Sequence, residues 1–84
     1  MDINEKILLL AILKKDTEES LNDVVFKLEN TGMFSLKEGK ILLKKLKSEQ
    51  FLSDSYLTLK GEVIAKNVEQ EFKIVDQFGT YIIK

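Results

Sequence analysis

The lysines between residues 35 and 50 are the side chains whose type and spacing most clearly suggest chemistry. Four of them recur at intervals of three, four and three residues: Lys37, Lys40, Lys44 and Lys47. On an α-helix, at roughly 100° per residue, this spacing places the four ammonium groups within about 80° of one another. Such a row could neutralise a polyanion, because each lysine that contacts a phosphate releases a counterion.

The charge distribution leaves two interpretations of this row open. The chain has a formal net charge of −1, which is less basic than most nucleic-acid-binding domains. Residues 35–50 nevertheless hold five lysines and two glutamates, whereas residues 1–34 hold four lysines and seven acids. Helix surfaces are commonly rich in lysine, so the row is also typical of a solvated face.

Several residue types are absent, and their absence excludes most other chemistry. The chain contains no His, Cys, Trp, Arg or Pro. Serine and threonine therefore have no imidazole to act as a general base, and the glycines are too scattered to cradle a phosphate. The acids at 18, 19 and 23 are explained by a helix start. We expect no enzyme, no metal, no cofactor and no small-molecule ligand.

Length and composition indicate one small domain covering residues 1–84, with a core at 3–76 and an uncertain tail at 77–84. No linker, repeat or low-complexity tract divides the 84 residues. A core of this size gives thin stability, and without Cys or His the common remedy is self-association, so we expect a homodimer. The apolar run Ile7–Leu13 is too short to span a bilayer and follows no secretory leader, which favours the cytoplasm and no membrane contact.

The first helix is predicted at about 3–15, and the second is predicted to follow a cap at residue 17 or 20 and to run through about residue 29. The first is apolar around its whole circumference, so it is either a central helix wrapped by the others or a homodimer interface along a second face. Thr17 or Ser20 caps the second helix, and apolar residues at i, i+3, i+4 and i+7 form its inward stripe: Leu21, Val24, Val25 and Leu28.

The third helix has the best-defined start in the chain. Ser35 and Glu38 have the spacing of a capping box, and the helix is predicted to run to about Gln50. Its inward face includes Leu42, Leu46 and Gly39, and the glycine indicates a close approach between two helices. A kink at a functional site is the less favoured explanation of Gly39.

The rest of the chain predicts a small hairpin and a fourth helix. Short strand-like runs at 51–53 and 56–58 flank a turn at Asp54 and Ser55. Thr58 then caps a helix predicted from about Leu59 to Asp76. The segment 72–83 could instead form a hairpin, and 80–83 has strand composition, so the tail stays open.

The order helix, helix, Gly-containing turn, helix, hairpin, helix resembles the winged helix-turn-helix family of prokaryotic and phage-type regulators. The similarity covers about residues 3–68. It is carried by Lys45-Leu46-Lys47-Ser48-Glu49-Gln50-Phe51-Leu52 and by Tyr56-Leu57-Thr58-Leu59-Lys60-Gly61-Glu62-Val63-Ile64-Ala65. The resemblance implies a mainly α fold, with four helices and a small two-stranded antiparallel wing. The wing loop is short and holds Asp54, so the resemblance does not extend to basic wing contacts.

The resemblance also implies a transcriptional regulator that inserts the helix at 35–50 into the major groove of double-stranded DNA. Lys37, Lys40 and Lys44 would face DNA, Ile41 would touch a thymine methyl, and Lys45 and Lys47 would neutralise phosphates. Binding would depend on salt and discriminate sequences modestly, because lysine is a point charge and arginine is absent.

Two further expectations concern protein partners. The dimer would be held by the first helix, by the back face of the fourth helix and by the tail, with Val63 and Ile74 on that back face and Phe78 and Tyr81 in the tail. The alternative function is a winged-helix protein–protein interaction module that uses the apolar first helix and the acidic surface.

Overall fold

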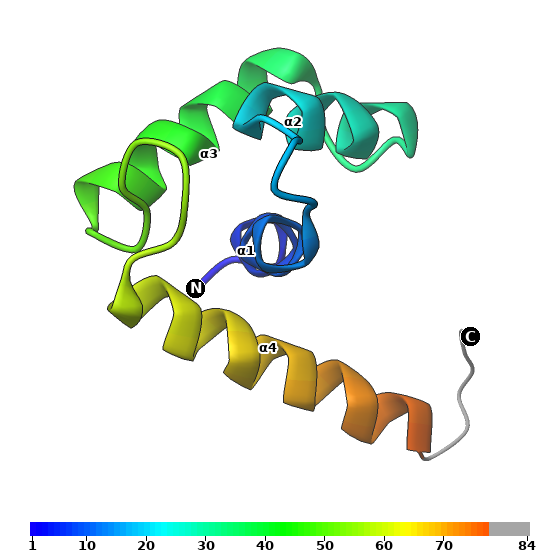
Figure 1. Ribbon diagram of the computed structural model, residues 1–84. Helices are drawn as coiled ribbons and strands as arrows, with labels where there is room; N and C mark the ends of the chain where they lie inside the picture. The colour runs from blue at the N-terminus through cyan, green and yellow to red at the C-terminus, as the bar shows by residue number, and fades with distance from the viewer. Residues whose placement is uncertain (78–84) are drawn as a thin grey trace.

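The computed structural model describes residues 1–77, with side chains described through residue 72. It contains four helices in this range: α1 (Ile3–Lys14), α2 (Leu21–Asn30), α3 (Leu36–Ser48) and α4 (Leu59–Gln77). Figure 1 shows α1 end-on in the middle, with α2 and α3 on one side of it and α4 crossing on the other. The mainly α expectation is confirmed, and the helix boundaries lie within two residues of their predictions, except that the start of α2 had two candidate positions.

Side-chain caps explain where the helices begin. The Ser35 hydroxyl accepts from the Glu38 amide at 3.1 Å, and the Glu38 carboxylate accepts from the Ser35 amide at 3.1 Å. Ser20 rather than Thr17 caps α2, through the same exchange with Asp23. The Thr58 hydroxyl caps α4 by accepting from the Gly61 amide at 3.0 Å. These bonds satisfy amides that a helix start otherwise leaves unpaired.

A left-handed residue ends α3. Gln50 has φ of 66°, and the amide of Phe51 donates to the carbonyl of Leu46 at 2.9 Å. The amide of Gln50 donates to the carbonyl of Lys47 at 3.0 Å, and together these two hydrogen bonds form a Schellman motif. Glycine is the usual residue at this position, because other residues meet steric strain there.

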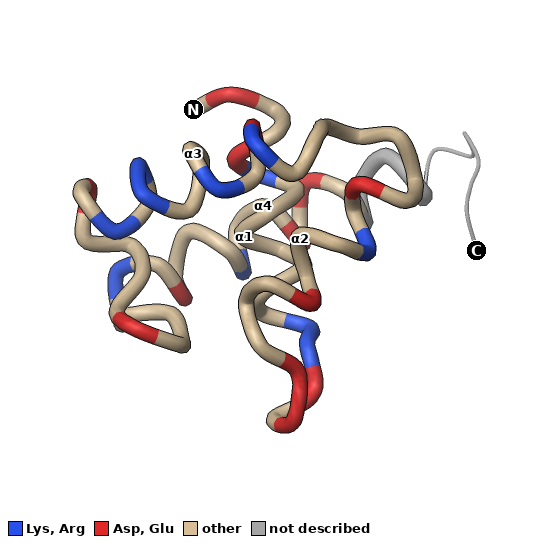
Figure 2. The backbone as a smooth tube through the Cα atoms, turned by 90° about the horizontal axis from the view of Figure 1, so that it is seen from above, with Lys and Arg blue, Asp and Glu red and all other residues tan. Residues whose placement is uncertain are grey.

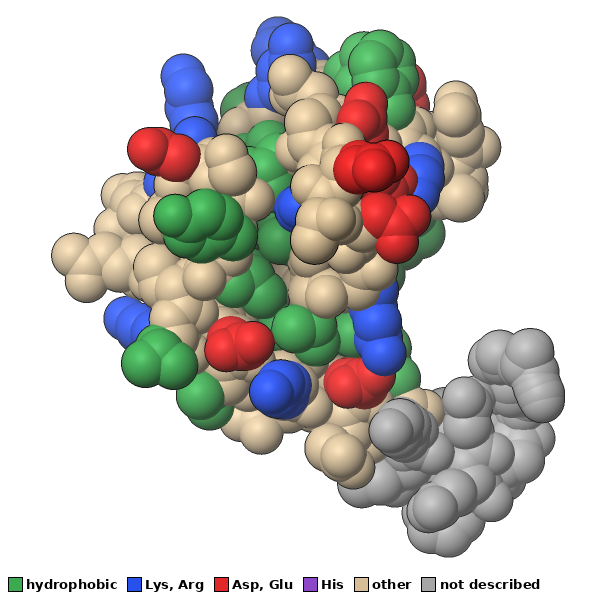
Figure 3. Space-filling model, in the orientation of Figure 1, with side chains coloured by type: hydrophobic (Ala, Val, Ile, Leu, Met, Phe, Trp, Pro, Cys, Tyr) green, Lys and Arg blue, Asp and Glu red, His purple; other side chains and the backbone are tan. Residues whose placement is uncertain are grey.

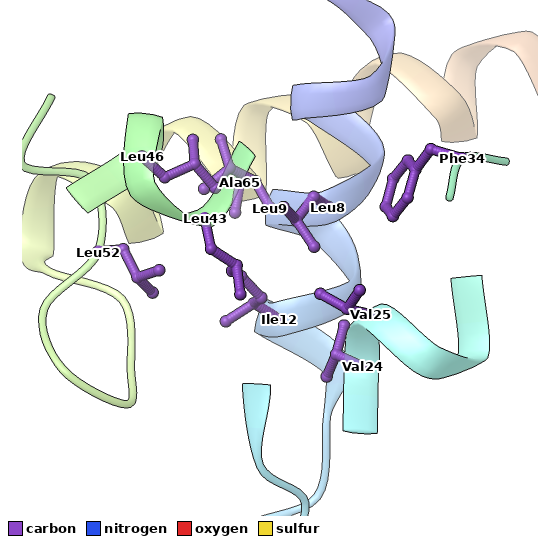
Figure 4. Close-up of a cluster of buried hydrophobic side chains, with 10 residues drawn as sticks. All are labelled: Leu8, Leu9, Ile12, Val24, Val25, Phe34, Leu43, Leu46, Leu52 and Ala65. Atoms are coloured by element: carbon purple, nitrogen blue, oxygen red, sulfur yellow. The ribbon is translucent and has the colours of Figure 1, made fainter. Parts of the chain in front are cut away.

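The core is built around α1. Leu8 and Leu9 are fully buried and Ile12 nearly so, and they meet side chains from the other three helices and from Leu52 (Figure 4). The wrapped-helix alternative therefore describes α1. One side of α1 stays partly accessible, because Ile3 is 54% exposed while Ile7 and Leu10 are only half-buried.

Gly39 marks a close contact between α2 and α3. A Cβ added there would lie 2.5 Å from Cγ1 of Val25 and 3.0 Å from the ring of Phe34. Both distances are shorter than ordinary van der Waals contact, so only glycine allows the two helices to approach this closely. The predicted close approach is confirmed.

The two-stranded wing is the part of the predicted fold that is wrong. No strand forms within residues 1–77, and Leu52 and Leu57 make a single antiparallel bridge. The bridge is closed by two hydrogen bonds, from Ser53 N–H to Tyr56 at 2.9 Å and from Thr58 N–H to Phe51 at 3.1 Å. Three-residue runs are at the lower limit of strand length, and most of this loop's backbone is used in returning the chain from α3 to α4.

Gly61 closes this loop against α4. A Cβ at Gly61 would lie 1.8 Å from the carbonyl oxygen of Phe51, so the loop backbone rests directly on the first turn of the helix. The hydroxyl of Thr58 also donates to the carbonyl of Gln50 at 2.7 Å. The Leu-Thr-x-x-Gly pattern at 57–61 therefore packs the turn against the start of α4, and this contact does not require the predicted strands.

The end of the described chain corrects one more expectation. Helix α4 continues to Gln77, so the alternative hairpin beginning at residue 72 is wrong for residues 72–77. The predicted strand-like segment at 80–83 lies outside the described residues. Across residues 1–77, no helix combines the length and apolar character that a membrane crossing requires.

Candidate nucleic-acid interface

The outer face of α3 carries the predicted row of lysines in an accessible position. Lys37, Lys40, Lys44 and Lys47 are exposed, and Ile41 beside them is 56% exposed. None of the four lysines makes an ion pair with any side chain in residues 1–72. Figure 2 shows the basic positions recurring along α3, so one helix face presents cations that the rest of the described molecule leaves unneutralised.

The opposite face of α3 fixes this orientation. Gly39, Leu43 and Leu46 are buried against α2 and the core, so the residues about half a turn away must point outward. The connection from α2 is short, because Thr31 ends α2 and Ser35 already caps α3. Gly32, with φ of 82°, provides the left-handed residue that turns the chain between the helices.

The diameter of α3, not the length of its lysine row, is what the width of a DNA groove must accommodate. The major groove of B-DNA is about 12 Å wide and admits an α-helix, whose diameter with side chains is about 10–12 Å. From Lys37 to Lys47 the helix rises about 15 Å, at 1.5 Å per residue. Helix α2, a short turn and α3 follow one another, and the second of these helices offers this row of cations.

Lys45 differs from the rest of the predicted site. Its Nζ lies 3.2 Å from Oε2 of Glu5, a carboxylate that is 2% exposed. The hydrogen bond and charge of Glu5 raise the pKa of Lys45 above its ordinary value. Lys45 therefore joins α3 to the start of α1, and the structure places it on the flank of the lysine row.

Glu5 is the residue that the sequence analysis missed. Its Oε1 accepts the Asp2 amide at 3.0 Å, so the same side chain completes a cap on α1 and meets Lys45. The Asp2-x-x-Glu5 spacing is a recognisable capping-box signal, and it would have identified this carboxylate as structural. No local pattern indicates that Glu5 is buried or that it meets a lysine forty residues away.

Several lysines elsewhere in the described chain have acidic partners. Lys6 lies 3.3 Å from Glu71 and Lys14 pairs with Glu69, so ion pairs on both sides join α1 to α4. Lys27 pairs with Glu19 at the edge of α2. The hydrogen bond between them lowers the pKa of Glu19 and raises that of Lys27. These contacts distinguish lysines that close the fold from those on the outer face of α3.

The acidic side chains gather on a different part of the surface. Asp16, Glu18 and Asp23 are exposed where α1 turns into α2. In Figure 3 acidic groups cluster over α2, while lysines project at the edge where α3 lies. The acidic groups over α2 thus lie apart from the lysines of α3, in a chain whose net charge is −1.

Comparisons with known proteins add no relative. No protein-family model matches the chain, and neither a curated protein nor a solved structure matches it. Among the residues that the structure describes, no three acidic side chains come together as metal ligands. The geometry of α3 is therefore the observation on which a functional hypothesis rests.

Proposed function

We propose that this chain is a small DNA-binding transcriptional regulator of winged-helix type that inserts α3 into the major groove of double-stranded DNA. The supporting observation is the row of four exposed lysines without ion-pair partners in residues 1–72, on the second helix of a helix-turn-helix unit. A fold alone does not define a function, so the proposal depends on this face and its charge.

Each residue of the face has a distinct role in this proposal. Lys37, Lys40 and Lys44 face the groove, where their ammonium groups reach phosphates and base-edge acceptors. Ile41 lies between them and contacts a thymine methyl. Lys47 neutralises a phosphate on the flank of α3.

Two features limit what this interface can recognise. Lys45 neutralises a phosphate only after it leaves Glu5, so its contribution is smaller than that of Lys47. Lysine cannot form the planar fork with which arginine reads guanine, so sequence discrimination is modest. The loop at 51–58 has no lysine and holds Asp54, so it stays clear of the phosphates.

We propose further that the regulator binds as a homodimer. Residues available for such a contact are the accessible side of α1, with Ile3 54% exposed, and Val63 of α4, which is 56% exposed. The other predicted dimer residues, Phe78 and Tyr81, lie outside the described residues, as does the side chain of Ile74. Sedimentation that gives a monomer at high micromolar concentration would contradict the dimer.

The second candidate function is a protein–protein interaction module. The acidic side chains that gather over α2 favour it, because they give this part of the exposed surface an acidic character (Figure 3). Such a module would use α2 rather than the predicted α1, since Leu8, Leu9 and Ile12 are buried.

Fluorescence anisotropy with a mixed-sequence duplex at two ionic strengths tests the DNA proposal. The triple variant K37A/K40A/K44A should lose most of its affinity. Its log–log salt slope should fall by about 3, because each phosphate contact contributes about 0.9. The control variant K15A/K27A/K66A has the same net charge as K37A/K40A/K44A, because it also loses three lysines. It should nevertheless bind DNA like the wild type. An equal loss of DNA affinity in both variants would show that binding depends only on the net charge of the chain. That result would overturn the assignment of α3 as the DNA-binding helix.

A further inference from the structure

The start of α4 carries an exposed apolar surface. Leu59 is 79% exposed, and Val63, one turn later on the same face of α4, is 56% exposed. Tyr56, in the loop before α4, is 68% exposed. Figure 3 shows apolar groups on the left of the molecule, over this loop and the start of α4. Exposed apolar side chains that lie together in this way are typical of a protein–protein contact.

A groove adjoins this surface between the end of α1, the loop and the first turn of α4. Its volume is about 210 Å³, which is smaller than the cavities that hold drug-sized ligands. The apolar part of its lining consists of Ile12, Leu13, Tyr56 and Leu57, and the polar part of Lys15, Thr17 and Glu62. Leu59 lies three residues before Glu62 on α4, so the groove continues onto the exposed apolar surface. A groove of this size suits a few side chains of a peptide segment.

Residues 78–83 have the composition that fits this surface. The segment lies outside the described residues and directly follows α4, which is described to Gln77. Four of its six side chains are large and apolar: Phe78, Tyr81, Ile82 and Ile83. Because covering apolar side chains is favourable for both partners, the segment and the surface at the start of α4 are suited to each other.

The length of the chain decides which copy can supply the segment. Leu59 lies 18 residues before Gln77 on α4, a separation of about 27 Å at 1.5 Å per residue. Tyr81 is four residues beyond Gln77, so even an extended chain carries it at most about 14 Å. The Cα atom of Tyr81 therefore stays at least about 13 Å from that of Leu59, and the Cα atom of Phe78 stays farther away. The two aromatic side chains cannot pack together on Leu59 of their own chain.

The accessible side of α1 is closer to the end of α4, but it is less suited to the segment. Ile7 and Leu10 on that side are already half-buried. Ion pairs made by Lys6 and Lys14 also join α1 to α4 on both sides of their contact. Less apolar area remains to be covered there than at the start of α4.

We propose that residues 78–83 of a second copy occupy the groove and the apolar surface at the start of α4. The inference rests on the homodimer of the proposed function and names the segment that holds it together. By two-fold symmetry, each copy supplies its segment to its partner and receives the partner's segment, so the two α4 helices run antiparallel. Figure 1 places α4 on the other side of α1 from α3, so this dimer leaves the lysines of α3 free to meet DNA.

Paramagnetic relaxation enhancement between copies tests this exchange. The chain contains no Cys, so Lys84→Cys gives a single site for a nitroxide spin label and keeps the four apolar side chains. The spin-labelled chain is mixed with isotope-labelled wild type, so that only contacts between copies broaden the observed amide signals. We expect broadening centred on Tyr56, Leu59 and Val63.

The outcomes separate this inference from the proposed function. Broadening centred on α1, or no broadening at a concentration where sedimentation shows a dimer, would overturn the exchange and leave the homodimer standing. A monomer in sedimentation would overturn both the exchange and the homodimer. DNA binding by α3 is measured independently, with K37A/K40A/K44A.

Substitutions measure the contribution of the contact to dimer formation. Leu59→Ser should raise the Kd of the dimer about tenfold or more in sedimentation equilibrium, because both copies lose an apolar side chain. Phe26→Ser is the matched control, because Phe26 is 52% exposed on α2, and it should leave the Kd unchanged. Tyr81→Ser should weaken the dimer as Leu59→Ser does. The double variant should lose less than the sum of the two effects, because both substitutions remove one contact. Equal Kd values for Leu59→Ser and Phe26→Ser would overturn the proposal.

Discussion

The two faces of α3 have opposite roles, and their difference separates what folds the molecule from what is available for binding. The inner face packs so closely that Gly39 leaves no room for a Cβ, and Leu46 is fully buried. The outer face has four exposed lysines without ion pairs to the described side chains. One helix can therefore be altered on one side for stability and on the other for binding.

The largest effect is expected from truncating the inner face. Leu46→Ala should lower the free energy of unfolding by about 2–5 kcal/mol, through lost burial and the cavity left behind. At 0.05–0.15 kcal/mol per residue, 84 residues give a total stability of roughly 4–13 kcal/mol. Urea denaturation followed by circular dichroism measures the loss. A change below about 1 kcal/mol would show that this face is less tightly packed than described.

The next effect comes from filling the close approach at Gly39. Gly39→Ala should destabilise the protein by up to about 2 kcal/mol, because overpacking costs about 1–3 kcal/mol and the better helix propensity of alanine offsets about 1 kcal/mol. The neighbouring variant Lys40→Ala, on the outer face, serves as the control in the same denaturation experiment. A more stable Gly39→Ala variant would mean that Val25 and Phe34 can move away from α3.

Lys44 and Lys45 are adjacent in sequence, but Lys44 lies on the outer face of α3 and Lys45 pairs with the buried Glu5. Lys45→Ala should lower the Tm, because it leaves the buried Glu5 carboxylate without its cation, whereas Lys44→Ala should change stability by less than about 0.5 kcal/mol. In DNA binding the order reverses, and Lys44→Ala should reduce the salt slope by about 1. Thermal unfolding and fluorescence anisotropy are measured on the same two variants. Equal changes of Tm and of salt slope in Lys44→Ala and Lys45→Ala would contradict the assignment of different roles to these two lysines.

The smallest effect is expected where α3 ends. Gln50→Gly should raise the free energy of unfolding by about 0.5–1 kcal/mol, because Gln50 occupies the left-handed region at φ of 66°. Phosphate contacts are unchanged by this substitution, so the salt slope should remain that of the wild type. A drop in stability would indicate that the Gln50 side chain contributes more than its backbone strain costs.

Local signals explain how much of this molecule its sequence predicts. Ser20, Ser35 and Thr58 fix helix starts because a cap depends on residues three positions apart. The outward direction of the α3 lysines follows from the inward leucines of the same helix. Gly39 likewise marks a close contact because it falls on the buried face.

The remaining features depend on contacts between distant segments. The runs at 51–53 and 56–58 have strand composition, yet their length and the contact between Gly61 and Phe51 leave room for one bridge only. The pairing of Glu5 with Lys45 arises from the packing of α1 against the end of α3. Periodicity and spacing contain no information about such a meeting.

Contact between the outer face of α3 and a polyanion can be observed by amide NMR of the full chain titrated with a mixed-sequence duplex at low salt. We expect progressive shifts centred on Lys37, Lys40, Ile41 and Lys44, and these shifts should disappear as salt is raised. Shifts centred on α2 or on the α1–α2 turn, or no shifts at any duplex concentration, would contradict it.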